Sequence, residues 1–137
     1  AIRRQRQMCI RDRFINRSDV KEALKTILAG IDNIKNGISM CIFPEGTRNK
    51  TEDLMLPFKE GSFKMAEKTG CLIVPMAISG SADILEAHFP KVKPVHVIVE
   101  YGKPIDPKSL DKDTRKKIGS HCQGVIAEML EKNNPQI

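Results

Sequence analysis

The sequence has few aromatic residues, and this scarcity excludes one class of function. Its 137 residues include five phenylalanines, one tyrosine and no tryptophan, so aromatic residues make up 4% of the chain. Proteins that bind single-stranded nucleic acid stack successive bases on aromatic rings, and this chain has too few rings for such a platform. We therefore expect no nucleic acid partner.

Cysteine pairs and long apolar runs are also missing. Outside the first 13 residues the cysteines are Cys41, Cys71 and Cys122, and their spacing indicates neither a disulfide framework nor a zinc site. Cys41 and Cys71 lie in apolar runs, which predicts reduced thiols in the core. The longest apolar run, residues 71–79, contains Pro75 and is far shorter than the roughly 18 residues of a membrane span. Any membrane anchor would therefore lie upstream.

Positive charge is concentrated at the amino terminus. The formal net charge is +6, but residues 1–13 hold five arginines and one aspartate, a net of +4, which leaves +2 for residues 14–137. Residues 1–13 lack apolar periodicity and resemble translated sequencing-adapter read-through. We interpret them as a non-native tail and assign one globular domain to residues 14–137. A basic lipid-binding or nucleic-acid-binding arm and part of a transit peptide are the alternatives.

Apolar periodicity predicts helices over residues 20–35 and 61–68, a short helix over residues 81–88, and a final helix that ends near Lys132. The residues predicted to cap these helices are polar or glycine: Asp19, Gly37, Gly70, and Asp111 or Asp113. The first helix has one apolar face and is expected to pack on another element.

Three short apolar segments predict buried strands over residues 38–43, 71–78 and 95–101. Pro75 removes a hydrogen-bond donor from the second segment, which indicates a sheet edge, a bulge or a strand end. Helices that alternate with such strands indicate an α/β fold, with a sheet flanked by helices.

Two segments that follow apolar stretches or polar loops carry the residues best suited to chemistry. Residues 43–48 read Phe-Pro-Glu-Gly-Thr-Arg, and residues 56–61 read Leu-Pro-Phe-Lys-Glu-Gly. Loops concentrate function, and this mixture of glycine, proline, carboxylate and cations suits a phosphate site better than a core. Glu45 has two possible uses, because it could accept a hydrogen bond from a substrate hydroxyl or pair with an arginine and hold the loop.

The residue types in these segments suggest individual roles. Arg48 offers a phosphate two parallel hydrogen bonds, and Lys59 offers a point charge. Gly46 lets backbone N–H groups approach an anion, and Thr47 adds a hydroxyl donor. Gly61 opens a predicted helix whose N-terminus favours an anion. The ordinary structural alternative is a surface ion pair between Arg48 and Glu45 or Glu52.

The two segments resemble motifs of the glycerolipid acyltransferases of the 1-acylglycerol-3-phosphate type. Residues 14–17 (Phe-Ile-Asn-Arg) resemble the family's Phe-x-x-Arg block, residues 43–48 its third block, residues 56–61 the extension of that block, and residues 73–78 its proline-centred fourth block. The similarity covers residues 14–105. It implies that the glycerol-3-phosphate moiety of the acceptor is bound by Arg17, Glu45, Gly46, Thr47, Arg48, Lys59 and Gly61.

The family's catalytic His-x-x-x-x-Asp block is missing from this sequence. In that block the histidine takes the proton of the acceptor hydroxyl, and the aspartate orients the imidazole ring. The residues five positions after the three histidines are Lys93, Tyr101 and Ile126. The resemblance therefore implies no catalytic residue here, and an N-terminally truncated part of an acyltransferase domain that is inactive by itself.

The resemblance implies transfer of an acyl group from acyl-CoA or acyl-carrier protein to the sn-2 hydroxyl of 1-acylglycerol-3-phosphate (lysophosphatidate), which gives phosphatidate. This chemistry requires no metal and no bound cofactor. The lipid substrate implies the cytoplasmic face of a membrane, with peripheral attachment or an upstream anchor. The alternatives are a non-catalytic module that binds phosphate or an anionic membrane, and a family member with another acceptor, such as glycerol-3-phosphate or a lysophospholipid.

Overall fold

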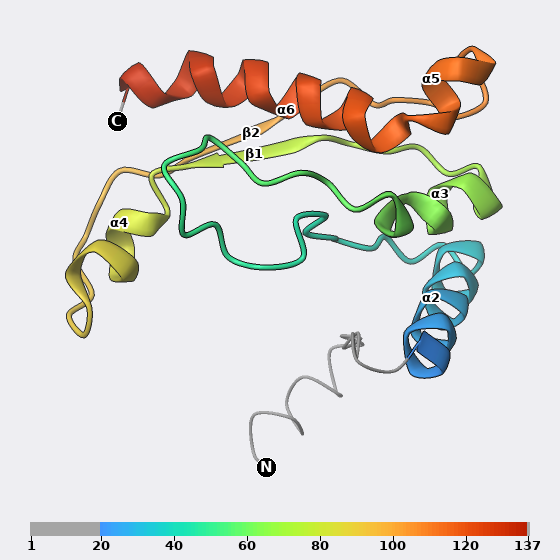
Figure 1. Cartoon of the computed structure of the whole chain (residues 1–137), viewed down its shortest axis with the longest axis horizontal. Helices are drawn as coiled ribbons and strands as arrows, with labels where there is room; N and C mark the ends of the chain where they lie inside the picture. Colours follow the sequence, from blue (N-terminus) through green and yellow to red (C-terminus); the bar gives the residue numbers. More distant parts are fainter. Residues whose placement is uncertain (1–19, 137) are drawn as a thin grey trace.

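The computed structural model describes residues 20–136 of the chain, drawn in colour in Figure 1. The predicted tail (residues 1–13), the predicted cap Asp19 and the predicted site residue Arg17 lie outside these residues. Helix α2 (Val20–Lys35) has the predicted bounds. Gly37, with φ 78°, follows its end, and the Gly37 N–H donates to the Ile34 carbonyl over 3.0 Å.

A two-stranded antiparallel sheet lies at the centre of the described chain. Strand β1 (Met76–Ser79) pairs with β2 (Ile98–Tyr101), with Met76 opposite Tyr101. Both strands are shorter than predicted. Strand β1 begins only after Pro75, because proline has no N–H to donate to the neighbouring strand. The Pro75 carbonyl still accepts a hydrogen bond of 2.8 Å from the Gly102 N–H. With helices around this sheet, the predicted α/β class is confirmed.

Residues 38–43 are not a strand, so that prediction was wrong. They have no regular secondary structure and no partner strand among the described residues, and Ile42 and Phe43 are exposed. A strand is defined by hydrogen bonds to a neighbour, and apolar composition alone does not supply one. Cys41 is exposed as well, so its predicted place in the core was also wrong.

The predicted final helix is two helices, α5 (Lys112–Lys116) and α6 (Ile118–Asn133), which meet at Lys117. The Asp111 carboxylate caps α5 by accepting hydrogen bonds from the N–H groups of Asp113 and Thr114, at 3.1 and 3.0 Å. Helix α6 runs along the sheet and contacts β1 (Figure 1). The core beneath it is formed by Phe63, Ile118 and Cys122, with partly buried residues packed around it: Phe58, Ile73, Ile105 and Leu110.

Short helices complete the described chain. The 3₁₀ turn η1 (Glu60–Phe63) leads into α3 (Lys64–Thr69), which packs against α2 and ends at Gly70 in the left-handed conformation, as predicted. Between β1 and β2 lie α4 (Ala82–Leu85) and η2 (Glu86–His88), and η3 (Asn134–Gln136) follows α6. Within residues 20–136, no helix combines the length and the apolar character that a membrane crossing requires.

Candidate phosphate-binding site

Residues 43–46 form a tight turn that depends on a glycine. The Gly46 N–H donates to the Phe43 carbonyl over 3.1 Å, and Gly46 has φ 72°, a left-handed conformation in which a Cβ would be strained. The N–H of Gly46 is thus used within the turn. The next two N–H groups, of Thr47 and Arg48, make no hydrogen bond within residues 20–136 and are available to an anion.

Two hydrogen bonds join the two segments identified from the sequence. The Lys59 N–H donates to the Pro44 carbonyl over 3.0 Å, and the Leu56 N–H donates to Oε2 of Glu45 over 2.8 Å. Of the two uses predicted for Glu45, the structure supports holding the loop, through a backbone N–H rather than an arginine. The backbone that carries Lys59 therefore lies directly beside the turn that precedes Arg48.

The second segment is fastened to helix α6 by two residues without an assigned role in the sequence analysis. The Phe58 N–H donates to Oε1 of Gln123, and the Gly119 N–H donates to Oε2 of Glu60, both over 3.3 Å. Lys117, at the start of α6, makes no side-chain cap, so Glu60 supplies an acceptor to the first turn of this helix. Phe58 and Phe63 stack with ring centroids 6.4 Å apart.

Arg48 is strongly exposed, with 80% of its side chain accessible. Its Nη1 lies 3.9 Å from Oε1 of Glu86, which is itself half-exposed. The partner is thus neither Glu45 nor Glu52, the acids nearest in sequence. A long ion pair between exposed side chains contributes little stability, so a phosphate can replace Glu86 at little cost. Thr47 and Lys59 are exposed as well.

Gly61 does not open a long helix. It is the second residue of the 3₁₀ turn η1, and α3 behind it has six residues. A helix this short has little macrodipole, so the helical contribution predicted at Gly61 is small. An anion would therefore be bound mainly by the side chains of Arg48 and Lys59 and by the free N–H groups of Thr47 and Arg48.

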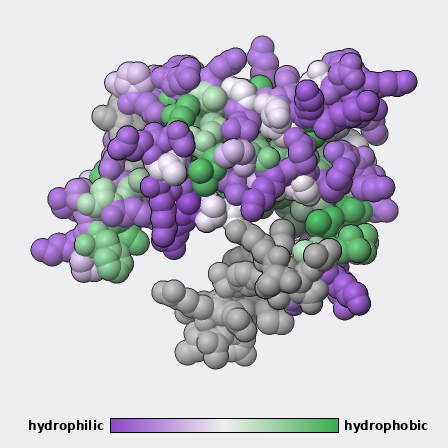
Figure 2. Space-filling view, viewed as in Figure 1, coloured by the Kyte–Doolittle hydropathy of each residue, from purple (hydrophilic) through white to green (hydrophobic). Residues whose placement is uncertain are grey.

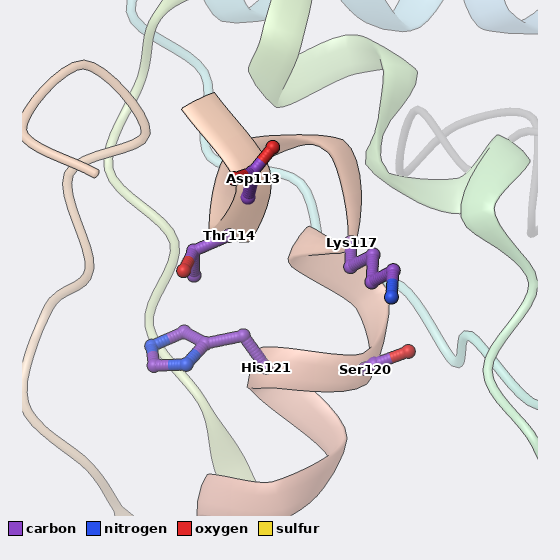
Figure 3. Close-up of a pocket in the computed structure, with 5 residues that line it drawn as sticks. All are labelled: Asp113, Thr114, Lys117, Ser120 and His121. Atoms are coloured by element: carbon purple, nitrogen blue, oxygen red, sulfur yellow. The ribbon is translucent and has the colours of Figure 1, made fainter. Parts of the chain in front are cut away.

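The histidines make no acid–base pair in the described chain. No hydrogen bond of residues 20–136 joins a histidine to a carboxylate, and no group of three or more histidine, cysteine, aspartate or glutamate residues there is placed to hold a metal. His121 lines a shallow hollow at the junction of α5 and α6 (Figure 3). The other residues around this hollow are Asp113, Thr114, Lys117 and Ser120. None of them belongs to the segments 43–48 and 56–61.

Comparison with known proteins identifies the family. A family model described as acyltransferase matches residues 8–79. The 1-acyl-sn-glycerol-3-phosphate acyltransferase of Saccharomyces cerevisiae is 36% identical over 120 residues, which are 86% of this chain and 39% of the relative. The enzyme of the same name from Escherichia coli is 30% identical over 125 residues, which are 90% of this chain and 50% of the relative.

A solved structure agrees with this result. The crystal structure of the 1-acyl-sn-glycerophosphate acyltransferase PlsC from Thermotoga maritima matches with a TM-score of 0.71 and 27% identity, over 80% of this chain and 44% of that chain. The chain thus spans half or less of the length of these relatives. The family match covers more than half of the chain, and it includes the whole of the turn at residues 43–48. The chain belongs to the acyltransferase family.

Proposed function

We propose that this chain forms the acceptor-binding part of a 1-acylglycerol-3-phosphate acyltransferase. The whole protein would transfer an acyl group from acyl-CoA or acyl-carrier protein to the sn-2 hydroxyl of lysophosphatidate at the cytoplasmic face of a membrane, with no metal or bound cofactor. The relatives from yeast and Escherichia coli carry this enzyme's name, which supports the proposal. The residues proposed to bind the acceptor are Arg17, Glu45, Gly46, Thr47, Arg48, Lys59 and Gly61.

The observation that carries the proposal is the pairing of the two cationic segments. The hydrogen bond between Lys59 N–H and the Pro44 carbonyl places the two backbones side by side, although Pro44 and Lys59 are 15 positions apart in the sequence. These backbones carry two free N–H groups, those of Thr47 and Arg48, and the cationic side chains of Arg48 and Lys59. All three residues are exposed. A phosphate monoester is a dianion with several acceptor oxygens, so it matches this set of donors.

Binding of a short-chain lysophosphatidate to the 137-residue chain tests the proposal. Monoacylglycerol with the same acyl chain is the reference ligand, because it lacks only the phosphate. We expect the chain to prefer lysophosphatidate, and we expect Arg48→Ala to reduce that preference by about tenfold to a hundredfold, the range for charge-assisted hydrogen bonds. Glycerol-3-phosphate as a competitor shows how much of the affinity resides in the headgroup.

Lys103→Ala is the matched control, because Lys103 is exposed and lies outside both segments. It removes one positive charge and should leave the preference unchanged. Equal binding of lysophosphatidate and monoacylglycerol by the parent chain would contradict the proposal. Equal losses in Arg48→Ala and Lys103→Ala would show that general charge, rather than this site, attracts the ligand.

A further inference from the structure

Residues 81–94, which include α4 and η2, form an arm that extends from one end of the described fold (Figure 1). Two backbone hydrogen bonds fold the arm back on itself. The Lys93 N–H donates to the Ile84 carbonyl over 3.1 Å, and the Lys91 N–H donates to the His88 carbonyl over 2.9 Å. The 81–94 arm is therefore a closed element with a defined tip rather than an open loop.

The tip of the 81–94 arm exposes large apolar side chains. Phe89 is 78% exposed, the highest value among the large apolar side chains of the described residues, and Val92 is 70% exposed. Ile84, at the base of the arm, is exposed as well. Figure 2 shows an apolar group at the edge of the molecule where the arm lies in Figure 1. An exposed phenylalanine and valine on a projecting tip suit insertion into an apolar phase.

Charge around the tip is positive. Lys91 lies in the tip between Phe89 and Val92, and Lys93 lies nearer the base, where its N–H pairs with Ile84; both lysines are exposed. The acidic residues of the arm, Asp83 and Glu86, lie in the helices α4 and η2 and not at the tip. Apolar side chains flanked by lysines are complementary to a surface of anionic lipid headgroups above hydrocarbon.

We propose that the 81–94 arm docks the protein on an anionic lipid bilayer. Phe89 and Val92 enter the interface between headgroups and acyl chains, and Lys91 and Lys93 contact lipid phosphates. The arm also reaches the candidate phosphate site, because Glu86 lies 3.9 Å from Arg48. Docking thus brings Arg48 close to the headgroups. This inference deepens the proposed function, on which the use of Arg48 rests, but docking itself requires no acyl transfer.

A single tryptophan introduced at the tip tests insertion directly. The chain contains no tryptophan, so the fluorescence of Phe89→Trp reports on this position alone. We expect its emission to shift to shorter wavelength when the full chain is mixed with vesicles of phosphatidylcholine that contain about 30 mol% phosphatidylglycerol. Brominated acyl chains should quench it. Tyr101→Trp is the matched control, because Tyr101 is an aromatic residue that is 68% exposed on β2 and should show neither effect.

Vesicle partitioning measures the contribution of each group. Phe89→Ala should weaken partitioning to these vesicles by about tenfold, and Lys91→Gln with Lys93→Gln by about 25-fold, or fivefold for each lysine. The corresponding controls are Tyr101→Ala, and Lys103→Gln with Lys112→Gln, which changes the net charge equally. The controls should partition like the parent, except for a small loss from the reduced net charge.

The outcomes separate this inference from the proposed function. Partitioning that is equal in the tip variants and their controls, together with no spectral shift of Phe89→Trp, would overturn docking through the arm, whatever Arg48 binds. Conversely, Arg48→Ala should lose its preference for lysophosphatidate and still show the spectral shift of a tryptophan at position 89, because Phe89 and Val92 remain in place. A chain that docks through the arm without any preference for lysophosphatidate would support this inference and contradict the proposed function.

Discussion

Cys122 lies on the core-facing side of α6 and is 2% exposed. Burial, and to a smaller extent the nearby charge of Glu60, raises the pKa of this thiol from 9.0 to about 11. Between pH 9 and pH 11 the Cys122 thiol therefore stays protonated in the folded state but is deprotonated in the unfolded state. The free energy of unfolding should therefore fall as pH rises from 9 to 11, with a contribution of at most about 1.4 kcal/mol per pH unit.

Urea denaturation at several pH values measures this contribution as the difference between the parent and Cys122→Ala. The variant lacks the thiol, so its stability should fall less steeply with pH, although the cavity makes it less stable at neutral pH. Cys41→Ala is the control for removal of a thiol outside the core, since Cys41 is exposed. Identical slopes for the parent and Cys122→Ala would contradict a raised pKa.

Individual residues of the candidate site were predicted from their types, but their partners were not. Arg48 and Glu45 stand in a run of residues whose chemistry suits an anion, and that run is visible without a structure. The partner of Arg48, Glu86, is 38 positions away, and the loop anchor Gln123 is 65 positions from Phe58. No local pattern encodes such separations. Glu60 lies within the quoted motif, and only the fold shows that it serves the start of α6.

Helices α2 and α6 each contain an interior glycine, and the two sites have opposite surroundings. A Cβ on Gly30 in α2 would overlap the sulfur of Met65, which is buried in α3. A Cβ on Gly124 in α6 would meet no atom within 4 Å. We expect Gly30→Ala to destabilise the fold by about 0–2 kcal/mol, because the cost of moving Met65 within a packed site, about 1–3 kcal/mol, is partly offset by helix propensity. Gly124→Ala should stabilise it by about 0.5–1 kcal/mol through helix propensity.

Equilibrium urea denaturation of both variants and the parent checks this pair. Met65→Ala in the Gly30→Ala background provides a second test, because it removes the overlapping side chain and should make the additional cost of Gly30→Ala small. Stabilisation by both alanine substitutions would show that α2 does not pack on α3 as the structure has it.

At the scale of the element, helices were predicted more accurately than strands. The apolar period of residues 20–35 and the glycines that follow α2 and α3 are local signals, and the structure has both helix ends where these signals place them. A strand depends on a partner that lies elsewhere in the sequence. Residues 38–43 have the composition of a strand without a partner in the described chain, and Pro75 shortens the next one. The break at Lys117 was not predicted, because the start of the final helix was placed from the capping residues Asp111 and Asp113, and the apolar period begins only at Ile118.

The whole molecule joins its parts through a few long-range contacts around α6. In the first half of this helix, Gln123 accepts a hydrogen bond from the Phe58 N–H, and the Gly119 N–H donates to Glu60. At its end, Lys132 and Asn133 donate to the two carboxylate oxygens of Glu100 in β2, each over 2.8 Å. The Lys132 and Asn133 side chains lower the pKa of Glu100, so this carboxylate stays ionised to more acidic pH. The site loop and the sheet are thus fixed to opposite ends of one helix, which lets the loop keep its shape without a partner strand for residues 38–43.

If the proposed acceptor site binds lysophosphatidate, we expect binding without turnover, because the described chain holds no general base for the reaction. Deprotonation of the acceptor hydroxyl needs a histidine held by a carboxylate, and residues 20–136 contain no such pair. When the 137-residue chain is mixed with lysophosphatidate and acyl-CoA, mass spectrometry should detect no phosphatidate above the level formed in buffer. The Escherichia coli relative serves as the positive control. Turnover that is abolished by His88→Ala, His96→Ala or His121→Ala would instead show that one of these histidines acts as a base.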